Sequence, residues 1–227
     1  MNYRQKNKTV QNCEAVCFDM DGVVADSMHA HAQCWIDVFK EHGVHLDKLD
    51  IFKREGMTGL ESIADIFIDK GFALPPEHIL RDLQKKKLQL FSNYQIEVYP
   101  QMFSIFPLLK SKGKKIGIVT GSFRYLVLEL IPEKLMKYVD VVVSVDDVKK
   151  GKPNPAPYLK AVEQLQVKPE QTIVVENAPM GIKAAKAAGL FCIAISTTLG
   201  PEFLKEADVV VQDHNELAAY LQYWVMY

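Results

Sequence analysis

The chain has 227 residues, of which 48% are hydrophobic and 24% are charged, as in an ordinary folded globular protein. Its 27 Lys and Arg nearly balance its 28 Asp and Glu, which gives a net charge of −1 at pH 7. This balance gives no general attraction to nucleic acid or to an anionic membrane. No apolar run approaches the length of a bilayer-spanning helix. These values argue against fibrous, disordered and membrane-spanning proteins, but a small anionic ligand fits them.

Residues 1–12 are basic and rich in amides, and they lack the apolar stretch of a secretory signal. We expect them to form a flexible leader. The four cysteines form neither a CxxC pair nor a cluster with zinc spacing. Cys13 and Cys17 flank or lie in one predicted strand, which holds them too far apart for a disulfide. We therefore expect reduced thiols, at least two of them buried, in a cytoplasmic protein that is a monomer by default.

Short β-branched runs alternate with helical patterns over most of the chain. We predict strands at 15–18, 115–119, 141–145, 172–175, 191–195 and 208–211. Helices are predicted between them, at about 101–112, 122–137, 155–167, 180–188 and 214–223. Most of the strands are continuous apolar runs, which is typical of a parallel sheet covered on both faces. The predicted fold is α/β, with a doubly wound, mainly parallel, Rossmann-like core formed by residues 13–28 and 98–227.

The long interval between the first two strands has helical patterns at about 27–42, 60–70 and 76–97. A loop of this length without structure is implausible inside a compact domain. We therefore predict a small inserted α-helical domain over residues 29–97. Tyr99-Pro100 would return the chain to the core, because proline resists continuing a helix. The connections near 26–30 and 97–100 are the candidate hinges.

Polar residues follow four of the predicted strands, at the edge where open α/β sheets bind ligands. The segments are Asp19-Met20-Asp21, Thr120-Gly121-Ser122, Gly151-Lys152-Pro153 and Glu176-Asn177. Each one alone could be a solvated turn, a helix cap or a surface charge. Their joint placement at four strand ends predicts a single site.

These residue types suit the transfer of a phosphoryl group. Two carboxylates two residues apart repel each other unless a cation or a proton relieves them, and Mg²⁺ with oxygen ligands can do so. One carboxylate can attack phosphorus while the other handles protons. Hydroxyls and backbone amides at a helix N-terminus can hold phosphoryl oxygens, and a lysine can offset negative charge.

The strings DMDGVVADS, TGS, GKPNP and ENAPMGIKAAKAAG, in this order, resemble the haloacid-dehalogenase-like superfamily. The likeness is strongest to its β-phosphoglucomutase-like branch, and it covers residues from about 15 to 200. It implies that the inserted helices at 29–97 are a cap domain that selects the substrate. It implies that Asp19 is the nucleophile and that Asp21 is the general acid and base. It implies that the phosphoryl group is held, and its charge neutralised, by Thr120, Gly121, Ser122 and Lys152.

The resemblance also implies a Mg²⁺ cofactor, bound by the Asp19 side chain, by the backbone carbonyl of Asp21 and by a group from the fourth motif. The family commonly has two acidic residues there, whereas this chain has Glu176-Asn177. An amide oxygen can bind Mg²⁺, but one negative charge is missing, and ligand charge is one determinant of cation affinity. We predict a weaker or more adaptable metal site at Asn177, with Glu176 helping through a water. A helix N-cap role for Asn177 is compatible with this.

Cap residues are candidates for substrate binding. His31 and Trp35 lie one turn apart, at a spacing similar to that of a His and a Trp in β-phosphoglucomutase-like members, where the His assists proton handling. Lys87 falls where the mutases keep a cap lysine, although it also fits a solvated helix face. Glu55 would repel bulky anions or hold a water or a second cation, unless it is only a surface charge. Gly59 stands where the mutase loop carries an arginine.

The leading prediction is a Mg²⁺-dependent phosphohydrolase that cleaves a small phosphate ester through an aspartyl phosphate on Asp19. The alternatives are an inorganic pyrophosphatase, a β-phosphoglucomutase-type phosphomutase and, from a different class, a receiver-like signalling domain. The absent loop arginine counts against the mutase, and the position of the Asp pair after the first strand counts against the receiver. Dehalogenation is disfavoured because Asp21 has no role in it. The expected partner is a small phosphorylated metabolite or pyrophosphate, with neither nucleic acid nor membrane.

Overall fold

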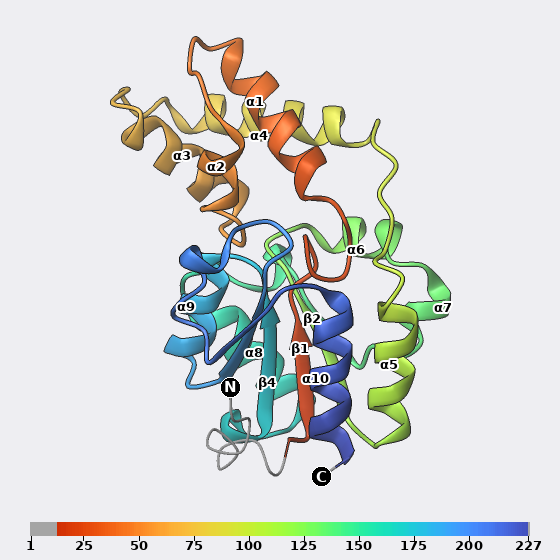
Figure 1. Cartoon of the computed structure of the whole chain (residues 1–227). Helices are drawn as coiled ribbons and strands as arrows, with labels where there is room; N and C mark the ends of the chain where they lie inside the picture. The colour runs from red at the N-terminus through yellow and green to blue at the C-terminus, as the bar shows by residue number, and fades with distance from the viewer. Residues whose placement is uncertain (1–12, 227) are drawn as a thin grey trace.

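The computed structural model describes residues 13–226, so the predicted leader at 1–12 lies outside the described residues. One sheet of six parallel strands has the order β3-β2-β1-β4-β5-β6 and carries helices on both faces (Figure 1). The strands are β1 Ala15–Phe18, β2 Lys115–Val119, β3 Val141–Val143, β4 Thr172–Glu176, β5 Phe191–Ile195 and β6 Val209–Val211. The prediction of a doubly wound α/β core is confirmed. The strand order reverses between β1 and β4, which is where such sheets bind ligands.

The register of the sheet brings the predicted motifs to one level. Phe18 at the end of β1 pairs with Ile118 of β2 on one side and with Val175 of β4 on the other. The residue after Phe18 therefore lies level with the ends of both neighbouring strands. Its backbone N–H donates to the Val175 carbonyl over 2.9 Å, so the ladder extends one residue beyond β1.

Both faces of the sheet are packed, which explains the continuous apolar runs of the strands. Ala15 and Cys17 of β1 belong to one hydrophobic cluster, and Val16 and Phe18 belong to the other. The first cluster contains side chains of α8 (Ala156–Leu165) and α9 (Pro179–Ala187), and the second contains those of α5 (Met102–Ser111) and α10 (His214–Met226). All four cysteines are buried and have free thiols, as predicted.

Four helices inserted between β1 and α5 form a separate layer above the carboxyl ends of the strands (Figure 1). They are α1 Met28–Lys40, α2 Lys48–Phe52, α3 Gly59–Asp69 and α4 Glu77–Phe91. Aromatic contacts hold this layer together, among them Phe39 against Phe67 with ring centroids 5.3 Å apart. The sequence pattern predicted three of these helices and missed α2. This short helix is started by a capping box of Asp47 and Asp50.

Several predicted boundaries differ from the structure. The predicted helix 122–137 is two helices, α6 Arg124–Leu130 and α7 Glu133–Met136, because Pro132 between them cannot continue α6. The predicted strand 141–145 ends at Val143, since a 3₁₀ turn, η2 Val145–Asp147, begins there with a capping box from Ser144. Two further 3₁₀ turns are η3 Pro169–Gln171 and η4 Pro201–Phe203. The helix predicted to reach residue 97 ends at Phe91.

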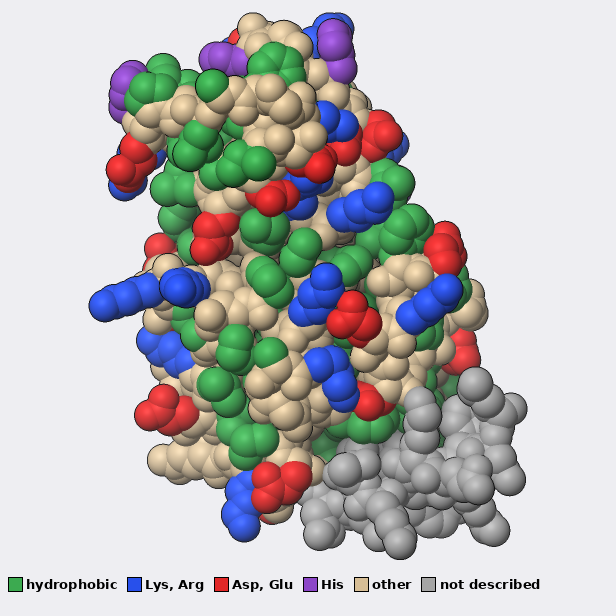
Figure 2. Space-filling view, turned by 90° about the vertical axis from the view of Figure 1, so that its left-hand side faces the viewer, with side chains coloured by type: hydrophobic (Ala, Val, Ile, Leu, Met, Phe, Trp, Pro, Cys, Tyr) green, Lys and Arg blue, Asp and Glu red, His purple; other side chains and the backbone are tan. Residues whose placement is uncertain are grey.

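The surface of the molecule reflects its balanced charge. Figure 2 shows acidic, basic and apolar side chains mixed over one side of the molecule, without an extended patch of a single charge on that side. Among the described helices, none combines the length and the apolar composition that a membrane crossing requires.

Candidate active site

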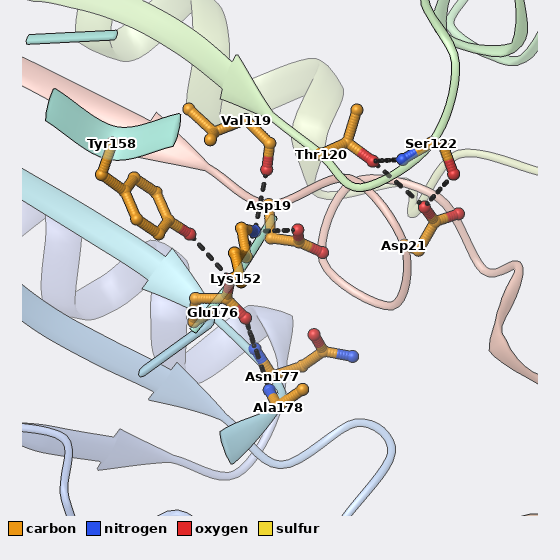
Figure 3. A network of polar contacts seen from close by, with 10 residues as sticks. All are labelled: Asp19, Asp21, Val119, Thr120, Ser122, Lys152, Tyr158, Glu176, Asn177 and Ala178. Atoms are coloured by element: carbon orange, nitrogen blue, oxygen red, sulfur yellow. Dashed lines mark hydrogen bonds and ion pairs between the residues drawn. The ribbon is translucent and has the colours of Figure 1, made fainter. Parts of the chain in front are cut away.

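Asp19 and Lys152 form a buried ion pair at the carboxyl edge of the sheet. Asp19 follows β1 and Lys152 lies in the loop that leads into α8, and the two side chains are 2% and 1% exposed. Lys152 Nζ donates to Asp19 Oδ1 over 2.5 Å, to Glu176 Oε1 over 2.7 Å and to the Val119 carbonyl over 3.0 Å (Figure 3). One lysine thus ties together the ends of β1, β2 and β4.

Glu176, at the end of β4, anchors this lysine. Its Oε1 accepts from Lys152 and from the Tyr158 hydroxyl, each over 2.7 Å. Its Oε2 accepts from the backbone N–H groups of Asn177 and Ala178, over 3.0 and 3.4 Å. Since both oxygens have partners within the protein, the structure gives Glu176 the role of holding Lys152 in place. Its predicted help to a metal through a water stays a prediction.

The charges at this edge are not balanced. Burial, together with the charges of Glu176, Asp21 and Glu55, raises the pKa of Asp19 well above its usual range, although Lys152 opposes the rise. Burial disfavours the charged form of Lys152, but Asp19 and Glu176 outweigh this effect and raise its pKa. The lysine therefore stays charged, and its single charge faces the carboxyl groups of both Asp19 and Glu176.

Two oxygens at this edge lack the partners that buried oxygens normally have. Within the described chain, Asp19 Oδ2 and Asn177 Oδ1 are the buried side-chain N and O atoms without a hydrogen bond. The Asn177 amide nitrogen donates to Thr198 Oγ1 over 2.9 Å, which turns the amide oxygen toward Asp19 (Figure 3). A buried oxygen without a partner is costly, and Mg²⁺ takes such oxygens as ligands. These two atoms fit a bound Mg²⁺.

The oxygens that fit a cation come from one carboxylate and one amide. No three His, Cys, Asp or Glu side chains among residues 13–226 gather as a set of metal ligands. A ligand from the Asp21 backbone carbonyl stays a prediction.

Asp21 lies on the tight turn after Asp19, and four neighbouring side chains hold its carboxylate by hydrogen bonds. Oδ1 accepts from Ser27 Oγ over 2.5 Å and is 2.9 Å from His31 Nε2. Oδ2 accepts from Ser122 Oγ over 2.9 Å and from Thr120 Oγ1 over 3.3 Å. Burial opposes ionisation of Asp21, but His31, Ser27 and Ser122 outweigh it and lower its pKa well below the usual range. The group is therefore a carboxylate in this state.

His31 and Lys87 extend this network into the inserted helices. Lys87 Nζ on α4 is 2.6 Å from His31 Nδ1 on α1, and both side chains are buried. Burial, reinforced by the Lys87 ammonium, lowers the pKa of His31, and burial also lowers that of Lys87. The consistent assignment is a neutral imidazole that accepts from Lys87 at Nδ1 and donates from Nε2 to Asp21. A chain of hydrogen bonds thus links α4 through α1 to Asp21.

A small cavity of about 60 Å³ lies between the inserted helices and the sheet edge. Its walls include all five residues predicted to bind substrate: His31, Glu55, Lys87, Gly121 and Ser122. Burial, followed by the charge of Asp21, raises the pKa of the Glu55 carboxyl to about 8. The volume is below the range of about 300–1,000 Å³ that is typical of ligand sites, so the helices must move to admit a larger ligand.

Arg54 lines this cavity, but its guanidinium is already paired with Asp65 over 2.6 Å and with Asp69 over 2.8 Å, so it differs from an arginine that is free to hold a second phosphate. At Gly59 an added Cβ would lie 2.5 Å from the Gln84 amide nitrogen, so the neighbouring helix occupies the space of a side chain.

Glycines allow the inserted loop at 55–58 to touch the sheet edge. An added Cβ at Gly56, whose φ is +89°, would lie 2.7 Å from the Lys152 side chain. An added Cβ at Gly121 would lie 2.8 Å from the Met57 carbonyl oxygen, and one at Gly151 would lie 2.8 Å from the Thr58 nitrogen. The backbone of the loop that carries Glu55 therefore packs directly against the loops that contain Gly121 and Gly151.

Sequence reasoning missed three residues of this network: Ser27, Tyr158 and Thr198. Tyr158 lies in an apolar stretch of α8 that is typical of core packing, and Thr198 follows β5 without any motif. Ser27 stands within the first motif, eight residues after Asp19, so its place on the same turn was the one available signal.

Comparisons with known proteins agree with this geometry. The family model for haloacid dehalogenase-like hydrolases matches residues 16–195. A validoxylamine A 7'-phosphate phosphatase from Streptomyces hygroscopicus subsp. limoneus is 33% identical over 204 residues, which are 88% of this chain and 93% of that protein. A phosphorylated carbohydrates phosphatase from Thermotoga maritima is 32% identical over 184 residues, which are 78% of this chain and 82% of that protein.

Solved structures that resemble this chain include proteins named as beta-phosphoglucomutases. A Bacteroides vulgatus chain provisionally named a beta-phosphoglucomutase has a TM-score of 0.87 and 30% identity, and the match covers 96% of this chain and 90% of that one. A beta-phosphoglucomutase from Clostridium difficile has a TM-score of 0.80 and 26% identity, with coverage of 94% and 97%. The relatives are thus named as phosphatases and phosphomutases. With the family model spanning most of the sheet and all the inserted helices, this chain is an enzyme that belongs to the haloacid dehalogenase-like hydrolase family.

Proposed function

We propose that the chain is a Mg²⁺-dependent phosphohydrolase that cleaves a small phosphate ester through an aspartyl phosphate on Asp19. The observation that carries the proposal is the meeting of Asp19, Asp21 and Lys152 beside two buried oxygens that have no partner. The relatives named as phosphatases of phosphorylated carbohydrates support the same class of substrate.

In the first step an oxygen of the Asp19 carboxylate attacks phosphorus, and the bond between phosphorus and the leaving oxygen breaks. Lys152, held by Glu176, offsets the negative charge of the nucleophile and of the phosphoryl group. Thr120 and Ser122, whose hydroxyls now donate to Asp21, can turn toward phosphoryl oxygens when substrate enters. When bound to Asp19 and Asn177, Mg²⁺ would supply positive charge that favours the ionised nucleophile.

Asp21 would handle the proton in both steps. A phosphate placed beside it raises its pKa, and the Lys87–His31 chain can deliver a proton to Oδ1. The protonated carboxyl then gives this proton to the leaving oxygen. In the second step Asp21 takes a proton from water, the water oxygen bonds to phosphorus, and the phosphorus–Asp19 bond breaks to release phosphate.

We also propose that the inserted helices are the cap domain predicted at 29–97. They carry His31, Glu55 and Lys87 to the cavity, and the Glu55–Thr58 loop closes against the sheet edge. Closure would exclude bulk water during attack on the substrate, and reopening would admit the water of the second step.

The test is a screen of phosphate release from sugar phosphates, glycerol phosphates, nucleotides and pyrophosphate, with Mg²⁺ and with EDTA. We expect turnover only with Mg²⁺, and we expect Asp19→Asn to abolish it without unfolding the protein. Retention of most of the activity by Asp19→Asn would refute the nucleophile assignment. Incubation with labelled substrate followed by acid quench should leave label on the wild-type chain and none on the variant.

A second candidate substrate is inorganic pyrophosphate. The small cavity and the Glu55 carboxyl favour a compact substrate over a bulky one, and the free space at Gly59 is already filled by Gln84. A ratio of kcat/KM for pyrophosphate over sugar phosphates that exceeds one, and that falls in Glu55→Gln, would support this substrate. A ratio well below one would exclude it.

A further inference from the structure

A buried histidine at the start of α10 contacts the turn that carries Asp21. His214, 4% exposed, lies with its Nε2 2.7 Å from the Val23 carbonyl oxygen, to which it donates. Val23 is two residues beyond Asp21 on a turn closed by the hydrogen bond from Gly22 N–H to the Ala25 carbonyl, 2.7 Å. His214 lies in α10 of the core, 191 residues after Val23 in the sequence. It belongs to none of the four motifs.

The same histidine contacts the segment by which the chain returns from the inserted helices. Its ring stacks on that of Tyr99, with centroids 3.9 Å apart and an angle of 26° between the planes. The Tyr99 hydroxyl donates to Asp26 Oδ1 over 3.0 Å. Asp26 belongs to the outgoing segment, which leads from β1 to the first inserted helix. His214 and Tyr99 together therefore touch both connections.

The two connections are also bonded to each other. Ala25 and Val98 form an antiparallel bridge. Asp26 N–H donates to the Glu97 carbonyl over 2.8 Å, and Tyr99 N–H donates to the Val24 carbonyl over 3.0 Å. The outgoing and returning segments thus form a short paired ladder, and a ladder moves as one body. His214 links this body to α10 of the core.

We propose that His214 is a positioning residue, which fixes the Asp21 turn through the Val23 carbonyl and holds the paired connections of the inserted helices against the core. Burial lowers the pKa of His214, which keeps the ring neutral with its single N–H available as the donor. The inference rests on the proposed function, because it takes Asp21 as the group that handles protons. Loss of the contact to Val23 should displace Asp21 by a fraction of an ångström, and such displacements are costly for catalysis.

The test compares His214→Phe, which keeps a ring against Tyr99 but cannot donate, with His214→Gln, whose amide can donate to Val23. With p-nitrophenyl phosphate and Mg²⁺, we expect kcat of His214→Phe to fall about fivefold to tenfold, the size of one lost hydrogen bond. KM should change less than twofold, and His214→Gln should recover most of the rate. Asn215→Ala, next to it on α10, is the matched control and should stay within twofold of wild type. It removes the side-chain oxygen that accepts from Gln101 and keeps the backbone N–H that donates to Asp213.

A double-mutant cycle separates positioning from general loosening of the fold. In the Asp21→Asn background, His214→Phe should cause no further loss of kcat, because it acts through a carboxylate that is already absent. An undiminished loss in that background, or a wild-type kcat in His214→Phe, would overturn the inference. If His214→Phe fails to fold, His214→Asn, whose shorter amide stops short of the Val23 carbonyl, takes its place. If Asp21→Asn alone leaves turnover intact, it is the proposed function that fails.

Discussion

Replacing Asn177 with Asp adds one negative charge at a side chain whose amide oxygen has no hydrogen-bond partner. Asn177 is fully buried beside Asp19, and its amide nitrogen donates to Thr198. In Asn177→Asp this donor is lost, and the Thr198 hydroxyl must turn to donate instead. Without a cation, the new carboxylate is buried next to another one, which destabilises the folded state. With Mg²⁺ bound, it is a better ligand than the amide.

The magnitude follows from linkage. Mg²⁺ stabilises the folded protein by RT ln(1 + [Mg²⁺]/Kd), so a tenfold lower Kd adds about 1.4 kcal/mol at saturating metal. In a domain of this size, about 1 kcal/mol corresponds to a Tm change of ~2–4 °C. We therefore expect the Mg²⁺-induced rise in Tm to be ~3–6 °C larger in Asn177→Asp than in wild type.

The assay is thermal unfolding at several Mg²⁺ concentrations, together with calorimetric titration of Mg²⁺, so the readout does not depend on turnover. Asn215→Asp, an added charge on an exposed position of α10, is the control and should leave the Mg²⁺ response unchanged. Tighter binding of Mg²⁺ by wild type than by Asn177→Asp would refute the reasoning. An equal response in both proteins would show that Asn177 is not a ligand.

Three further predictions concern the inserted helices. The Glu55 carboxyl has a pKa of about 8 in the folded state against an ordinary 4.5, so the unfolded chain releases a proton between these values while the folded chain keeps it. Metal-free stability should therefore fall as pH rises from about 4.5 to 8, and Glu55→Gln should flatten this slope in thermal unfolding scans; an unchanged slope contradicts the assignment. Lys87→Met removes the ammonium beside His31, so the His31 pKa should rise, as followed by NMR of the imidazole protons; a fall would show that Lys87 does not set it. Gly151→Ala places a Cβ 2.8 Å from the Thr58 nitrogen, so the loop must shift, and kcat/KM should fall about tenfold or more; wild-type kinetics would show that the closed contact is dispensable.

The sequence was enough to predict the sheet and the positions of the motifs. Apolar runs such as Lys115–Val119 gave five strands to within a residue or so. Because the carboxyl ends of parallel strands share one edge, the residues after each strand had to meet. Asp19, Asp21 and Lys152 do meet there, and their catalytic roles stay predictions.

Other features depended on packing that a single sequence does not encode locally. One of the partners that hold Glu176 is Tyr158, which reaches it from α8 and whose sequence context is that of an ordinary core residue. α2, with five residues, is too short for a helical period to be visible. The break at Pro132 was signalled by the proline itself, and the helical pattern on both sides obscured it. His214 follows β6 without a motif, so its contact with Val23 is visible only in three dimensions.

The hydrogen bond between Asp26 and Glu97 has a topological consequence. The chain leaves the core and re-enters it at two backbone atoms that are only 2.8 Å apart. The four inserted helices therefore occupy the position that the turn of a hairpin would have between these two segments. The connectivity of the six strands is therefore the same with or without the four helices. The packing is not divided in this way, because one hydrophobic cluster contains side chains of both α1 and α8.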